Sequence, residues 1–328
     1  MHIHRLLPLQ KLALQCTILT MIYYLFASVG LALAFEQDNI SPVWPPTGIA
    51  IAALLIFGFR LWPGIFVGAL LTNLSTDSAL SLAVTIAIGN TLEALAATYL
   101  INRFANKIPF TNIINTSLFI LFIVISTMVS ASIGVTALFV NDVIKADNVP
   151  TLWETWWLGD VTGGLIITPL LLVWKKTPSF HITKQRLVEI SILSAITLSL
   201  VLLVFSSLFL TDNASHLIVL LFLPLLAWTA TRFHAHGVTL IMAILSTSAI
   251  ASTIYGFGPF VMETENESLL LLQASVGASM MTVLMLVASQ EERMLAHNVV
   301  TEVKQNLETL VLTRTEELHS TNLQLKLE

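Results

Sequence analysis

Ten apolar segments follow one another between residues 12 and 289, and they constrain the fold of this chain more than any other feature. Hydrophobic residues make up 55% of the 328 residues and charged residues only 11%. A soluble protein cannot hide so much apolar surface, and a lipid environment favours helices, which pair their own backbone groups. The sequence therefore predicts an all-α, polytopic membrane helical bundle. The segments cover residues 12–35, 46–59, 61–74, 82–101, 117–140, 154–174, 188–210, 216–231, 237–256 and 268–289.

The number of crossings depends on two short segments, 46–59 and 61–74. A spanning helix needs about 20 residues. If both short segments cross, the bundle has ten spans; if they enter and return as a re-entrant pair, it has eight. The basic start MHIHRLLPLQK has no small-residue cleavage site after its apolar run, which favours a retained first helix over a cleaved signal peptide.

Charges in the connections alternate in sign. One set of connections is basic, with Arg5, Lys11, Arg60, Arg103, Lys107, Lys175, Lys176, Lys184, Arg186 and Arg232. The other set is acidic apart from Lys145, with Glu36, Asp38, Asp77, Asp142, Asp147, Glu154, Asp212, Glu263, Glu265 and Glu267. By the positive-inside rule, the basic side and both termini are expected in the cytoplasm of a bacterial inner membrane.

The second segment begins at the motif Trp44-Pro45-Pro46-Thr47. Proline suits the first turn of a helix, where its missing N–H would have no partner. The positive end of such a helix can hold an anion or a carbonyl-rich ligand, and short helices often mark membrane binding sites. The alternative is that the prolines only start the helix and that Trp44 anchors it at the interface.

Polar residues inside later segments point to the same region. Asn90 and Glu93 are three residues apart and share a helix face, and Asp160 lies in an otherwise uncharged segment. A carboxyl in the bilayer needs a partner, a cavity or water, although an interhelix hydrogen bond that fixes packing would also explain Glu93. Tyr23 and Ser130 are interpreted as packing residues. The candidate ligand-binding set is Trp44, Pro45, Pro46, Thr47, Asn73, Asn90, Glu93, Trp156, Trp157 and Asp160.

The later segments repeat the earlier hairpin weakly. Pro224 and Arg232 match Pro46 and Arg60 in an order of proline, apolar run, arginine turn and return helix, which suggests a parallel internal repeat. His234 and His236 lie in the second turn without a third ligand, so no metal site is assigned. Cys16 is the one cysteine and excludes a disulfide framework. No catalytic residue and no cofactor is assigned.

Composition changes at residue 290. Residues 1–289 are expected to form the transmembrane domain, and residues 290–328 a charged linker helix with an incomplete heptad pattern. Its candidate signal-transmitting residues are Val303, Leu307, Val311 and Leu318. A dimer through this helix is expected, and an amphipathic tail without a partner is the alternative. Because the chain stops in mid-helix, we also expect a cytoplasmic output domain beyond residue 328.

Three stretches together carry a family resemblance: PVWPPTGIAIAALLIFGFRLWPGIFVGALLTNL, IGNTLEALAATYL and WWLGDVTGGLIITPLLLVW. Over residues 40–175 their order and spacing resemble the first class of bacterial membrane-associated sensor domains, MASE type one. The resemblance implies about eight spans and a place at the N-terminus of sensor histidine kinases, diguanylate cyclases or phosphodiesterases. It implies a role without naming a ligand.

The resulting hypothesis is a sensory input domain that binds a ligand from the periplasmic side and signals through its last span. The expected partners are membrane lipids, an unknown small molecule or partner membrane protein, and a second copy of the chain, with no nucleic acid. A transporter is the alternative, favoured by the repeat and the intramembrane carboxyls. A membrane enzyme is disfavoured because the sequence shows no triad, metal cluster or phosphate-binding loop.

Overall fold

The computed structural model describes residues 8–32, 43–76, 78–105, 109–175, 183–206 and 219–325, which contain helices and no strand. Seven helices are long and apolar enough to cross a membrane, and two shorter apolar helices accompany them in this part of the chain. The all-α membrane bundle expected from the sequence is confirmed. Several connection residues used in the charge argument, such as Asp38, Asp77 and Asp212, lie outside the described residues.

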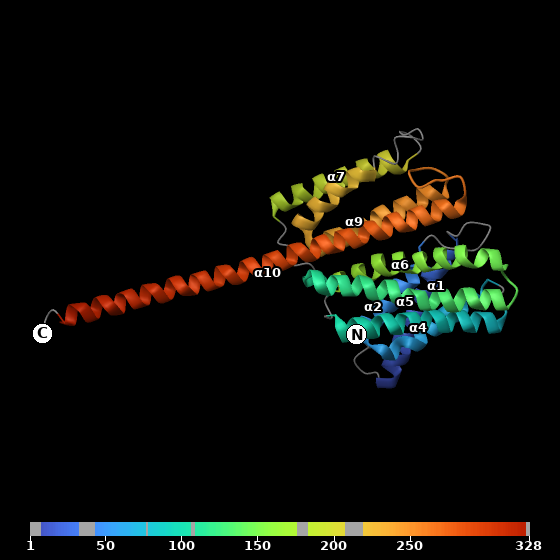
Figure 1. Cartoon of the computed structure of the whole chain (residues 1–328), viewed down its shortest axis with the longest axis horizontal. Helices are drawn as coiled ribbons and strands as arrows, with labels where there is room; N and C mark the ends of the chain where they lie inside the picture. Colours follow the sequence, from blue (N-terminus) through green and yellow to red (C-terminus); the bar gives the residue numbers. More distant parts are fainter. Residues whose placement is uncertain are drawn as a thin grey trace.

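The described helices follow the expected segments closely. They are α1 (Pro8–Ala32), α2 (Pro45–Phe57), α3 (Trp62–Leu74), α4 (Leu80–Phe104), α5 (Ile113–Val140), α6 (Val149–Trp174), α7 (Lys184–Phe205), α9 (Phe222–Ile254) and α10 (Glu265–Leu325). Short 3₁₀ turns lie at Phe59–Leu61, Pro109–Thr111, Ala146–Asn148 and Val219–Leu221. In Figure 1, α7, α9 and the first part of α10 lie beside a group formed by α1 to α6.

Helix α10 extends far out of the bundle (Figure 1). Its 61 residues form one continuous helix, about 92 Å long at 1.5 Å per residue. We call the end of the bundle from which it leaves the tail end, and the opposite end the far end. At the tail end, the side chain of Glu292 accepts a hydrogen bond of 3.2 Å from the backbone N–H of Ile113. The expected signal-transmitting residues Val303, Leu307, Val311 and Leu318 are each more than half exposed.

Helices α2 and α3 form the first hairpin. Each has 13 residues and is therefore about 20 Å long, shorter than the hydrocarbon core of about 30 Å. A turn at Phe59–Leu61, which contains Arg60, joins them. Helix α1 packs closely on α3, because a Cβ at Gly64 would lie 2.7 Å from the carbonyl oxygen of Cys16. The hydroxyl of Thr20 donates to the carbonyl of Gly64 at 3.0 Å.

The second hairpin lies within α9. His234 has φ 52° and ψ −153°, which interrupts the helix between the two segments expected there. A Cβ at Gly237 would lie 3.0 Å from Cγ2 of Thr229, eight residues earlier. In a straight helix, eight residues span about 12 Å, so the chain reverses at His234. Arg232 lies just before this reversal, and Arg60 lies in the turn of the first hairpin. This shared order is consistent with an internal repeat.

Candidate functional site

The N-terminus of α2 lies deep inside the bundle. The N–H of Trp44 donates to the carbonyl of Gly159 at 3.1 Å, and a Cβ at Gly163 would lie only 2.1 Å from the carbonyl oxygen of Trp44. Two glycines one turn apart thus let the start of α2 touch the backbone of α6. Gly159 lies ten residues into α6, about 15 Å from its start. The proline motif therefore lies below the far end, deeper than an interfacial anchor.

Polar residues of four other helices lie close to the N-terminus of α2. Asn90 lies ten residues into α4, Ser130 ten residues before the end of α5, and Asp160 eleven residues into α6. Each position is about 15 Å along its helix from the far end. Similar depths on neighbouring helices bring the side chains together. We call Tyr23, Trp44, Thr47, Asn90, Glu93, Ser130 and Asp160 the polar cluster.

Hydrogen bonds join the cluster across helices. The hydroxyl of Thr47 donates to Oδ1 of Asp160 at 2.9 Å. Asn90 is bonded on both sides: its Oδ1 accepts from the hydroxyl of Ser130 at 2.7 Å, and its Nδ2 donates to the hydroxyl of Tyr23 at 3.2 Å. All five side chains are buried, Tyr23 to 1% and Asp160 to 0% exposure. One of these bonds joins α2 to α6, and the other two join α1, α4 and α5.

Glu93 is the least satisfied member of the polar cluster. Its side chain is 1% exposed and its carboxyl lies against Thr47, Ser130 and Asp160. Neither of its oxygens has a hydrogen bond of standard geometry within the described residues, and the same holds for Oδ2 of Asp160. The two carboxyls interact directly. Buried polar groups without partners are uncommon and often mark functional positions.

The tryptophans of the candidate set have different surroundings. Trp44 interacts through its side chain with the hydroxyl of Tyr23, and Trp156 with the carboxyl of Asp160. Trp156 also packs on Gly134, where a Cβ would lie 2.6 Å from its ring. Trp157 points elsewhere: its Nε1 donates to the carbonyl of Val124 at 2.9 Å and its ring stacks on Trp153.

The other candidates play lesser parts. Pro45 and Pro46 form the first turn of α2, and the N–H of Thr47 is bonded to the carbonyl of Trp44 at 3.3 Å. Asn73 is half-buried near the end of α3 and donates its amide to the carbonyl of Ala69 in its own helix at 2.8 Å. The first-turn N–H of Thr47 and one N–H of the Asn73 amide are therefore used within the protein.

Two members of the polar cluster were interpreted from sequence as packing residues. Tyr23 is the only polar cluster member on α1, and Ser130 begins a run of small residues on α5. The sequence does contain a signal for Ser130, because Ser130 lies at the same depth in its segment as Asn90 does. Tyr23 gives no such signal, since tyrosine is common on both packing and interfacial faces.

Helix α6 also contacts α10, between the far end and the polar cluster. Nε2 of Gln273 donates to the carbonyl of Thr155 at 3.1 Å, and the hydroxyl of Thr155 donates to Oδ1 of Asn266 at 2.9 Å. Gln273 is fully buried, and its Oε1 has no partner among the described residues. One turn further, Gly277 faces Thr162. Helix α6 thus connects the polar cluster to the helix that leaves the bundle.

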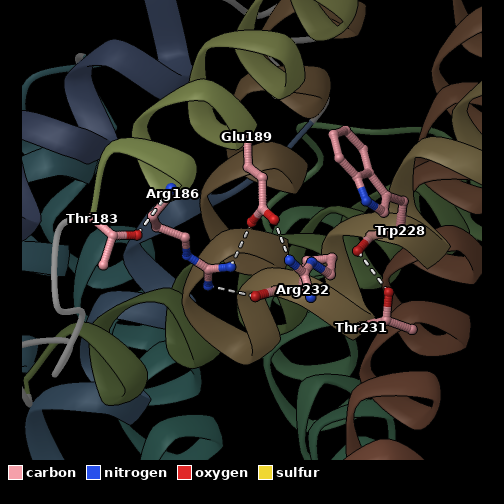
Figure 2. A network of polar contacts seen from close by, with 6 residues as sticks. All are labelled: Thr183, Arg186, Glu189, Trp228, Thr231 and Arg232. Carbon is pink, nitrogen blue, oxygen red and sulfur yellow. Dashed lines mark hydrogen bonds and ion pairs between the residues drawn. The ribbon is translucent and has the colours of Figure 1, made fainter.

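Charged residues hold α7 and the second hairpin at the tail end. Glu189 forms ion pairs with Arg186, at 2.9 Å, and with Arg232 (Figure 2). Arg186 also donates to the carbonyl of Arg232 at 2.5 Å (Figure 2). Nδ1 of His234 lies 3.2 Å from Oε1 of Glu291 on α10. The reversal in α9 therefore touches α10 where it leaves the bundle.

The two best-defined cavities of the described structure lie away from the polar cluster. One, of about 390 Å³, runs between α7 and α9 and is lined by apolar side chains, among them Leu193, Phe233 and Ile241. The other, of about 350 Å³, lies between the start of α1 and the Arg60 turn. The rings of His236 and Trp174 pack edge to face beside the first cavity. No group of three or more His, Cys, Asp or Glu suited to a metal occurs among the described residues.

Comparisons with known proteins agree with this architecture. The family model MASE1 matches residues 16–293. A relative, "Probable diguanylate cyclase DgcE" of Escherichia coli (strain K12), is 27% identical over 267 residues, which are 80% of this chain and 23% of the relative. The chain thus spans about a quarter of the length of that relative. No solved structure matches. The chain belongs to the MASE1 family of membrane sensor domains.

Proposed function

We propose that the polar cluster binds a small ligand and that α6 passes the resulting change in packing to α10, and so to a cytoplasmic output domain. The observation that carries this proposal is the position of α6. One face of α6 presents Asp160 to Thr47 of α2, and another presents Thr155 to Gln273 of α10. A shift of α6 relative to α2 therefore also changes the surroundings of α10.

The path from α6 to the exit of α10 has polar contacts at both ends. Thr155 and Gln273 lie near the far end, and Glu291 and Glu292 lie where α10 leaves the bundle. Between them one face of α10 is buried, with Met280 and Leu284 fully enclosed. A packed helix with discrete contacts at each end can take up two arrangements, and a ligand with different affinity for the two shifts their populations.

The distribution of charge supports a cytoplasmic tail end. The described basic residues of the bundle that lie toward the tail end include Lys11, Arg60, Arg103, Lys175, Lys184, Arg186 and Arg232. Acidic residues gather at the far end, among them Asp142, Asp147, Glu154, Glu263, Glu265 and Glu267, with Lys145 as an exception. Under the positive-inside rule, the tail end would lie on the cytoplasmic side and the far end on the periplasmic side.

The relative suggests the kind of output. Its printed name is that of a probable diguanylate cyclase, and this chain matches 23% of its length. We propose that residues 290–328 form a dimeric linker to such a domain, or to another signalling enzyme. Residues 1–289 would then be the sensor and residues 290–328 the transmitter. The long exposed part of α10 is suited to this role because a continuous helix carries rotation and translation along its axis (Figure 1).

A fusion of the chain to a diguanylate cyclase domain tests the proposal. Asp160→Asn and Glu93→Gln should each change cyclic di-GMP formation at least several-fold at equal amounts of folded protein in the membrane. Glu154→Gln, at an exposed position on α6, is the matched control and should leave output unchanged. If both cluster variants signal like the wild-type fusion, the polar cluster is not the input site.

The same variants separate the sensor from a transporter. Internal repeats with broken helices and intramembrane carboxyls also occur in transporters. Solute uptake into proteoliposomes that is lost in Asp160→Asn, with unchanged output of the fusion, would favour transport. Output that changes without any solute uptake supports the sensor.

A further inference from the structure

The two carboxyls of the polar cluster are buried side by side without a cation in the described part of the chain. Glu93 is 1% exposed and Asp160 is 0% exposed. The recorded ion pairs of arginine and lysine lie elsewhere, at the tail end of the bundle or on the exposed part of α10. Two uncompensated negative charges in so dry a place are strongly disfavoured, and a compact positive charge is needed to neutralise one of them.

The hydrogen bonds around the two carboxyls also indicate that a positive charge is needed there. The hydroxyl hydrogen of Thr47 is used on Oδ1 of Asp160, and that of Ser130 on Oδ1 of Asn90. Both oxygens of Glu93 and Oδ2 of Asp160 stay without a partner of standard geometry within the described residues. Ionised carboxylates only accept hydrogen bonds, so they cannot satisfy each other. One added proton turns one carboxyl into a donor and satisfies an oxygen on each.

We propose that the ligand of the polar cluster is a proton, shared between the carboxyls of Glu93 and Asp160. The proton comes from water, binds one carboxylate and is hydrogen-bonded to the other, so the pair then carries a single negative charge. This remaining charge lies beside Thr47 in the first turn of α2, where the positive end of the helix dipole stabilises an anion. The inference names the ligand in the proposed function and rests on that function for its effect on signalling.

Close packing around the pair also favours a ligand without bulk. The backbones of α2 and α6 touch beside it, since a Cβ at Gly48 would lie 2.5 Å from the carbonyl oxygen of Gly163. The two best-defined cavities of the described structure lie elsewhere. A proton needs no cavity, whereas an organic ligand of even modest size would have to separate these helices.

The groups that face the pair are few, and one of them can titrate. They are Tyr23 on α1, Trp44 and Thr47 on α2, Asn90 on α4, Ser130 on α5 and Trp156 on α6. Of these, Tyr23 is the titratable one, and its hydroxyl already accepts from Asn90. Glu93 and Asp160 are the carboxyls of the polar cluster, so we assign the shared proton to them.

Infrared difference spectroscopy of the whole chain in lipid nanodiscs tests the inference, with pH as the variable. The wild-type chain should show one carboxylic-acid C=O band that shifts in D₂O and disappears on titration to alkaline pH. Glu93→Gln and Asp160→Asn should each remove this band, because the new amide N–H takes the place of the shared proton. Glu154→Gln should keep it, and Asp160→Glu, which conserves the pair, should keep it with a displaced midpoint.

Two results would overturn the inference. One is the absence of a protonated carboxyl in the wild-type chain at every pH at which the helices stay folded. The other is loss of the band at constant pH when choline chloride is replaced by NaCl, which would assign the pair to Na⁺. The fusion to a cyclase is a separate readout. A titrating pair with an output that ignores pH would refute the signalling role and leave proton binding standing.

Discussion

The hydroxyl of Thr47 on α2 donates a 2.9 Å hydrogen bond to the carboxyl of Asp160 on α6, between residues 113 positions apart in the sequence. Both side chains are buried, and the bond lies where the short helix α2 begins. It connects the first hairpin to the helix that also contacts α10. Its removal is therefore the most direct disturbance of the polar cluster that leaves both carboxyls in place.

Thr47→Val replaces the hydroxyl by a methyl group of similar size. Oδ1 of Asp160 then loses its recorded donor, and a buried acceptor without a partner costs about 1–3 kcal/mol. The midpoint of thermal unfolding in nanodiscs, followed by tryptophan fluorescence, should fall. Thr282→Val is the matched control, because Thr282 is exposed and bonds only to Ala278 of its own helix. Equal midpoints for the two variants would contradict the assignment.

Gly163→Ala tests the close approach of α2 and α6. The new Cβ would lie 2.1 Å from the carbonyl oxygen of Trp44, which is backbone and cannot rotate away. Overpacking of this kind costs about 1–3 kcal/mol or more, so the yield of folded protein and the unfolding midpoint should both fall. Gly277→Ala, also at a helix contact, would meet Thr162 Cγ2 at an ordinary 3.4 Å and should be tolerated.

Gln273→Met distinguishes an effect on thermal stability from an effect on the coupling between the polar cluster and α10. The substitution keeps the length of the side chain and removes an amide whose Oε1 has no partner among the described residues. Because an unsatisfied buried oxygen is lost, thermal stability should stay equal or rise. The contact with Thr155 is lost as well, so the response of the cyclase fusion to changes at Asp160 should weaken. Unchanged coupling would show that the amide is not part of the path.

Disulfide cross-linking tests the dimeric linker. In a Cys16→Ser background, Leu307→Cys should cross-link between two copies in the membrane, because Leu307 belongs to the apolar register expected at the dimer contact. Glu308→Cys, one residue further along the same exposed helix, points about 100° away and is the control. Equal cross-linking at both positions, or none at either, would contradict a specific dimer.

Hydrophobic segments predicted much of this fold. Their limits anticipated both hairpins, including the reversal at His234, because charged and turn-forming residues interrupt apolar runs where a chain leaves the bilayer. The short length of α2 also indicated a broken helix. Its depth was not evident, because depth is set by the contact of Trp44 with Gly159 and Gly163 on a helix far away in the sequence.

The polar cluster was predicted less completely than the helices. Asn90, Glu93 and Asp160 stood out because polar groups are costly in lipid, and the structure brings them together. Trp157 is not part of the polar cluster. It follows Trp156 directly on α6 and therefore points in another direction, toward Val124, while Trp156 faces Asp160. Tyr23 was missed because a single tyrosine in an apolar helix does not reveal which way it faces. Rotation about a helix axis depends on neighbours that the sequence does not name.

The continuity of α10 has a consequence for how an attached domain must be joined to it. A helix turns by about 100° per residue, so every residue added or removed beyond Glu292 swings whatever follows around the axis. Seven residues restore nearly the original direction, whereas two point the attached domain almost backward. A domain attached to α10 therefore keeps its orientation only when the length of the helix between them changes by about seven residues at a time.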